Sequence, residues 1–185
     1  MDLRRLAAFL AVAAALAGCG KDDGLSPGAT PLELARPSFT LTDGDGQPFE
    51  FRSKTAGKLT FLEFGYTNCP DVCPLIADHL ASAQRRNGDL RVIAVSVDPK
   101  RDTRPAIRRF LARHRAGARF RYVTGSRREL APVWRKYHIA AVAGPAATVS
   151  HSSVSILVDP KGRERRLFDS SVSSGSVLRA IAAGG

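Results

Sequence analysis

The chain has 185 residues, and its 28 Lys and Arg against 17 Asp and Glu give a formal net charge of +11. Hydrophobic residues make up 44% and charged residues 24%, which is typical of a globular domain and excludes a wholly disordered chain. Three cysteines, 16 Gly and 11 Pro exclude disulfide-rich, collagen-like and low-complexity proteins.

The first residues have the pattern of an export signal. Arg4 and Arg5 precede an apolar run of 11 residues, 6–16, which matches a signal-peptide core and is too short to span a membrane. The run ends in Leu16-Ala17-Gly18-Cys19, which resembles the lipobox of bacterial lipoproteins. We therefore expect removal of residues 1–18, a lipid on Cys19, and a membrane-anchored domain outside the cytoplasm in a bacterial cell envelope. A plain secretory signal with a spare cysteine is the alternative.

Residues 19–37 are rich in Gly, Pro and small polar side chains and show no apolar period, so they predict a tether. The remainder, residues 38–185, predicts a single domain without internal repeats. At its start, residues 39–42 and 48–51 alternate apolar and polar side chains around an Asp-Gly-Asp-Gly turn at 43–46. This pattern predicts an N-terminal β-hairpin.

Strands and helices are predicted to alternate through the rest of the domain. Helical spacing is found in residues 74–86 and 103–114, in a helix that opens with the capping box Ser126 to Glu129, and in residues 174–183. Strand patterns lie at residues 59–66, 92–97, 120–123, 154–158 and 164–168. This order predicts an α/β domain with a central mixed sheet flanked by helices.

The segment between the strand at 59–66 and the following helix contains Cys69 and Cys73. Functional groups are often exposed where a strand of an open α/β sheet ends. Pro74 lacks an amide hydrogen and belongs in the first turn of the helix or before it. We therefore expect both thiols at or just before a helix N-terminus, whose partial positive charge favours thiolate over thiol.

The spacing of these cysteines favours some chemistries over others. If the segment were helical, their Cβ atoms would lie roughly 5–6 Å apart, whereas a disulfide needs about 3.5–4.5 Å. The pair therefore favours reversible oxidation or metal binding, and a structural disulfide is the alternative.

A histidine is the natural third metal ligand. His79 lies on a predicted helix, and His114 and His138 lie near helix ends, where an imidazole has structural uses. His151 is the best candidate, because it precedes the strand at 154–158 in a loop that can return beside the cysteines. Two thiolates and an imidazole form a soft set that selects Cu(I), while zinc usually takes a fourth ligand.

These motifs resemble the SCO/SenC family, thioredoxin-fold copper proteins of cytochrome c oxidase assembly. The resemblance covers residues 37–183 and is carried by Phe64-Gly65-Tyr66-Thr67 with Cys69-Pro70-Asp71-Val72-Cys73-Pro74, by Ser96-Val97-Asp98-Pro99 with Arg101-Asp102-Thr103, and by His151 ahead of Asp159-Pro160 and Gly162. The chain departs from the family at Ser150, where an Asp often precedes the histidine; the change weakens support for that ligand.

The resemblance implies a thioredoxin-like fold and a copper metallochaperone that binds copper through Cys69, Cys73 and His151. Such proteins deliver copper to subunit II of cytochrome c oxidase or to another copper acceptor. A membrane-anchored thiol–disulfide reductase acting on the cysteines of that subunit is the alternative, with Cys69 attacking and Cys73 resolving. A peroxidase is a third hypothesis. Asp71 and Asp98 are candidates for supporting the site, or for simply capping a helix and starting a turn.

The excess charge lies in one segment. Residues 100–136 contain 13 basic and 2 acidic residues. This segment predicts either a docking face for an acidic partner or anionic lipid, or an ordinary solvated surface. A nucleic-acid partner is not expected, because the export signal places the domain outside the cytoplasm.

Overall fold

The computed structural model describes residues 29–34, 38–143, 149–150 and 153–184. Its helices are α1 (Phe51–Thr55), α2 (Val72–Arg86), α3 (Arg104–Arg113), α4 (Arg127–Lys136) and α5 (Ser174–Ala182). Its strands are β1 (Ala29–Leu34), β2 (Thr40–Asp43), β3 (Pro48–Glu50), β4 (Thr60–Gly65), β5 (Arg91–Ser96), β6 (Phe120–Thr124), β7 (Val142–Ala143), β8 (Val149–Ser150), β9 (Ser155–Val158) and β10 (Glu164–Phe168).

Eight strands form one mixed sheet, in the order β1-β10-β9-β4-β5-β6-β2-β3. The central strands β4, β5 and β6 are parallel, because helical crossovers connect them. β9 lies antiparallel to β4 on the other side, and β10 follows it. β4 is buried along its whole length, as its largely apolar sequence requires. The predicted α/β fold with a mixed sheet is confirmed.

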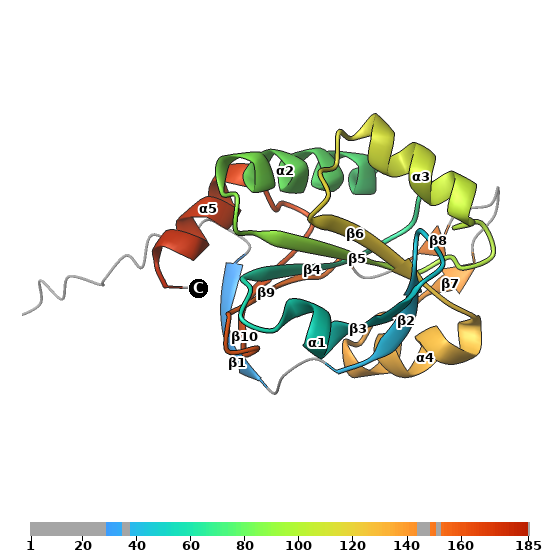
Figure 1. The fold of residues 1–185 in the computed structure, drawn as a ribbon, viewed down its shortest axis with the longest axis horizontal. Coiled ribbons are helices and arrows are strands. Elements are labelled where there is room, and N and C mark those ends of the chain that lie inside the picture. The colour runs from blue at the N-terminus through green and yellow to red at the C-terminus, as the bar shows by residue number, and fades with distance from the viewer. Residues whose placement is uncertain (1–28, 35–37, 144–148, 151–152, 185) are drawn as a thin grey trace, which may run out of the picture.

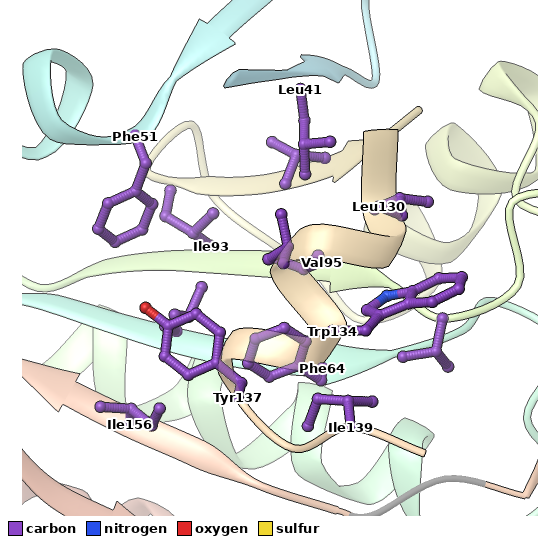
Figure 2. Close-up of a cluster of buried hydrophobic side chains, with 14 of the residues drawn as sticks. Leu41, Phe51, Phe64, Ile93, Val95, Leu130, Trp134, Tyr137, Ile139 and Ile156 are labelled. Carbon is purple, nitrogen blue, oxygen red and sulfur yellow. The ribbon is translucent and has the colours of Figure 1, made fainter. Parts of the chain in front are cut away.

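The helices cover both faces of this sheet (Figure 1). α2, α3 and α5 lie over one face, and α1 and α4 lie over the other. Successive strand residues alternate between the two layers, so that Phe61 packs under α2 while Leu62 and Phe64 join the cluster with α4. Figure 2 shows this second cluster, in which the rings of Tyr137 and Phe64 pack together with their centroids 5.1 Å apart.

The predicted N-terminal hairpin is present as β2 and β3, with Leu41 opposite Phe49. Phe51, expected in its second strand, instead begins α1, because the Glu50 carboxylate accepts hydrogen bonds from the N–H groups of Arg52 and Ser53 and caps that helix. The predicted capping box of α4 is confirmed, since the Ser126 and Glu129 side chains bond each other's backbone N–H groups.

The N-terminal segment differs from its prediction. A tether was expected over residues 19–37, but Ala29–Leu34 form β1, which pairs antiparallel with β10 at the sheet edge (Figure 1). Pairing with an existing edge can order a segment that has no apolar period of its own. Cys19 and the expected signal peptide lie outside the described residues. Within the described part of the chain, no helix has the length and apolarity to cross a membrane.

Candidate metal and thiol site

Cys69 and Cys73 lie at the connection between β4 and α2. Cys69 sits in the turn after the strand, with its N–H donating to Tyr66 O at 3.3 Å, and Cys73 is the second residue of α2. Both are free thiols; Cys69 is half-buried and Cys73 is buried in the hydrophobic cluster. The predicted position of the thiols at a helix N-terminus is therefore confirmed, although the turn that carries Cys69 is not helical.

The pKa values of the two thiols are shifted in opposite directions. The pKa of Cys69 is lowered to about 6, chiefly because Cys73 hydrogen-bonds to it; burial opposes the shift, and the N–H groups of Asp71 and Cys73 and the Tyr66 side chain add to it. The pKa of Cys73 is raised, because its proton is held by that same hydrogen bond and because its thiol is buried. The pair thus places a half-buried thiol of lowered pKa beside a buried thiol, an arrangement suited to soft metal ions and to disulfide exchange.

This difference predicts selective alkylation of the metal-free protein. At neutral pH, iodoacetamide is expected to modify Cys69 first, with a rate that rises through about pH 6, because the thiolate is the nucleophile. Peptide mass mapping of the product distinguishes Cys69 from Cys73. A rate that begins to rise only above pH 8 would contradict the assignment.

Glu63 of β4 lies behind the thiols. Its side chain is buried at 6% exposure, and the Ser155 hydroxyl of β9 donates to it. Burial raises the pKa of Glu63 to about 8, with the negative charge of Cys69 adding to the shift. A cavity just large enough for a water molecule, about 10 Å³, is lined by Glu63, Cys73 and Tyr122. The carboxyl group beside the thiols is therefore carried by a strand of the central sheet.

Residues 66–71, which connect β4 to α2, are called here the cysteine turn. Asp102 links this turn to the sheet by hydrogen bonds. Its carboxylate accepts the Thr67 N–H at 2.8 Å and the Ser96 hydroxyl at 2.6 Å, and Tyr122 Oη lies 2.8 Å away. Tyr122 Oη also lies 3.0 Å from Gly65 O. Burial raises the pKa of Asp102, and these hydrogen bonds oppose the shift. The start of the cysteine turn is thus held by a buried carboxylate from the next crossover.

Glu63, Asp102 and Tyr122 were not predicted as site residues. Two sequence signals were available: Glu63 is a carboxylate inside an otherwise apolar strand, and Asp102 belongs to the Arg101-Asp102-Thr103 motif. Neither signal names a partner. Those partners come from other strands and loops.

The two aspartates proposed as supporting groups have different places. Asp71 is exposed at the N-cap of α2, its carboxylate makes no capping bond, and its contribution to Cys69 comes from the backbone N–H. Asp98 is buried and pairs with Arg101 at 2.5 Å, while its carbonyl accepts N–H bonds from Arg101 and Asp102. In the structure, Asp98 therefore closes the turn that carries Asp102.

His151, the predicted third ligand, lies outside the described residues. The neighbouring elements are described: β8 ends at Ser150, paired with Val142, and β9 begins at Ser155, paired with Glu63. Val154 packs against the hydrophobic cluster that contains Cys73, as does Cys69. Among the described residues, no group of three potential ligands is assembled. His114 is buried, with Nδ1 2.8 Å from Asp78, and has a structural role.

Solved structures of SCO proteins have the same fold. The crystal structure of Arabidopsis thaliana ScoI with copper bound has a TM-score of 0.71 and 28% identity, covering 80% of this chain and 99% of that chain. Bradyrhizobium japonicum ScoI with copper bound has a TM-score of 0.65 and 27% identity, covering 82% of this chain and 98% of that chain. The thioredoxin-like fold is thereby confirmed.

Sequence comparison agrees with this result. An SCO2-like protein of Rickettsia conorii is 30% identical over 140 residues, which are 70% of this chain and 67% of the relative. The SCO1/SenC family model matches residues 28–183. The match begins just before β1 and ends just after α5, so it includes the whole described sheet and the cysteine turn. The chain belongs to the SCO1/SenC family.

Proposed function

We propose that this protein is a copper metallochaperone that serves the assembly of cytochrome c oxidase. The observation that carries the proposal is the pair of free thiols at the N-terminus of α2, one with a lowered pKa and the other buried beside it. Two thiols in contact suit Cu(I), which prefers soft ligands, better than hard cations. Two related solved structures hold copper.

We infer that Cys69, Cys73 and His151 bind the metal. The antiparallel pairing of β9 with β4 supports the histidine, because it brings the start of β9 to the end of β4 from which the cysteine turn emerges. His151 is four residues before Ser155, the partner of Glu63. The bound copper ion is the cargo that the protein passes to an acceptor protein.

The acceptor in this proposal is subunit II of cytochrome c oxidase or another copper protein. The proposed location is a bacterial cell envelope, with the domain outside the cytoplasm and a lipid on Cys19 anchoring it to a membrane. The lipobox-like residues 16–19 support this location. Metabolic labelling with a radioactive fatty acid tests the anchor, since label is expected in the parent chain and absent from Cys19→Ser.

Replacement of His151 tests the ligand set. We expect His151→Ala to weaken Cu(I) binding at least about 100-fold, because loss of a direct ligand exceeds the effect of an outer partner. Competition with a Cu(I) chelator under reducing conditions gives the affinity. The control is His138→Asn, which changes an exposed histidine at φ 54°, a conformation that Asn tolerates. Equal affinity of His151→Ala and the parent would count against the ligand.

A thiol–disulfide reductase is the second candidate, and the lowered pKa of Cys69 favours it. The Cys69 thiolate attacks a disulfide of the substrate and releases one substrate thiolate. Cys73 then loses its proton and attacks the mixed disulfide, which releases the second substrate thiolate and leaves a Cys69–Cys73 disulfide. The reductase needs no imidazole ligand. Reduction of an oxidised subunit II peptide that persists in His151→Ala, with copper binding lost, separates the two functions.

A further inference from the structure

A basic cleft of about 330 Å³ lies beside the cysteine turn. Thr67 and Asn68 form one wall, and Asn68 directly precedes Cys69. The rest of the cleft is formed by Arg101, which precedes α3, and by four residues of α3: Ala106, Arg109, Phe110 and Arg113. Among the residues that the structure describes, no acidic side chain lines it. The sequence segment with the excess of basic residues therefore contributes to a recessed site, and this site adjoins the turn that carries Cys69.

The arginines of the basic cleft are available to an anion. Arg109 and Arg113 are exposed and one turn apart on α3, and neither has an ion pair with any residue in the described part of the chain. Like charges at this spacing repel each other and destabilise a helix. α3 carries no acidic residue to offset them. An anionic occupant would relieve this repulsion, whereas Arg101 already pairs with Asp98.

The position of the basic cleft relative to Cys69 is fixed by the fold. Asp102, which directly follows Arg101, holds the Thr67 N–H at 2.8 Å and links the start of α3 to the cysteine turn. Phe110, which lies between Arg109 and Arg113 in the sequence, is buried. Its ring packs edge-on against Tyr122, with ring centroids 5.8 Å apart. The two walls are thus held by the buried core. An occupant of the cleft lies against the turn that presents Cys69.

We propose that the basic cleft binds an acidic segment of the protein that exchanges copper or electrons with Cys69. The identity of that partner rests on the proposed function, whereas the binding chemistry rests on the cleft alone. A recessed site accepts a projecting carboxylate side chain but not the flat face of a bilayer. Arginines beside the apolar side chains of Ala106 and Phe110 suit a peptide, which contributes both charged and apolar contacts, better than a small hydrated anion.

The experiment measures binding of a fluorescent peptide of Asp and Glu residues to the full chain, with the same peptide in Asn and Gln as its control. We expect binding that weakens with added salt and that falls about tenfold in Arg109→Gln/Arg113→Gln. The matched control is Arg128→Gln/Arg135→Gln, which removes two exposed arginines from α4 on the other side of the sheet (Figure 1). That variant is expected to bind like the parent.

Several outcomes overturn the proposal: absence of peptide binding, an equal loss in both double variants, or displacement of the peptide by inorganic phosphate at equal charge concentration. Arginine-dependent binding to phosphatidylserine vesicles but not to the peptide assigns the face to a membrane and also overturns it. Cu(I) affinity is measured on the same samples. It is expected to be unchanged in Arg109→Gln/Arg113→Gln, so failure of the cleft and failure of copper binding are distinguished.

Discussion

Replacement of Cys73 by serine is expected to abolish tight Cu(I) binding. The serine side chain has a similar size, but its hydroxyl is a hard, neutral ligand where a soft thiolate is needed. The serine hydroxyl can still donate to the Cys69 sulfur, so the kind of hydrogen bond that contributes most to the low pKa of Cys69 is kept. We therefore expect two results together: a loss of Cu(I) affinity by several orders of magnitude, and a pKa of Cys69 that stays below its ordinary value.

Chelator competition and the pH dependence of alkylation measure these two effects on one sample. Cys19→Ser is the matched control, because it removes the cysteine expected to carry lipid and leaves both thiols of the site. It is expected to leave the Cu(I) affinity unchanged. Tight Cu(I) binding by Cys73→Ser, or loss of binding in Cys19→Ser, would falsify the two-thiol site.

Replacement of Asp102 by alanine is expected to have the largest effect on stability. It leaves the Thr67 N–H and the Ser96 hydroxyl without their carboxylate partner, whereas the Tyr122 hydroxyl keeps the Gly65 carbonyl as an acceptor. Unsatisfied buried groups cost about 1–3 kcal/mol each, and relaxation limits the total, so we expect a loss of about 3 kcal/mol in the free energy of unfolding. Urea denaturation followed by circular dichroism measures it.

Two further variants make this prediction specific. Asp102→Asn keeps an acceptor for Thr67 and is expected to lose only about 1 kcal/mol. Because burial raises the pKa of Asp102, the folded parent holds its proton more tightly than the unfolded chain and loses stability as pH rises above the usual Asp range. The deficit of Asp102→Asn should therefore shrink as pH rises. Asp89→Ala, at an exposed turn, is expected to change stability by less than about 0.5 kcal/mol.

The part of the site that could be predicted from sequence is local. Cys69 and Cys73 lie four residues apart, next to a strand end and a proline, so chain geometry alone places them at a helix N-terminus. The capping box of α4 and the hairpin are local for the same reason. The groups that support the thiols are not local: Thr67 meets Asp102 across 35 residues, and Gly65 meets Tyr122 across 57. Such meetings depend on strand order.

The edge strand β1 shows the same limit in the backbone. Its alternation of apolar and polar side chains is limited to Leu32-Glu33-Leu34, and the Gly- and Pro-rich surroundings favour a linker. Their structure is set by β10, whose free edge supplies hydrogen-bonding groups to any extended segment that reaches it. Local sequence contains no information on such a neighbour.

The cysteine turn is held at both ends, which limits the residues that can change conformation. Thr67 is held by Asp102 at one end, and Cys73 is packed in the core within α2 at the other. Between these fixed ends lie Asn68 to Val72, a hinge only five residues long. A change in the sulfur–sulfur distance, through oxidation or metal binding, is therefore expected to move these five residues. The sheet is expected to keep its structure. We therefore expect oxidation or metal binding to change the conformation of residues 68–72 more than that of the sheet.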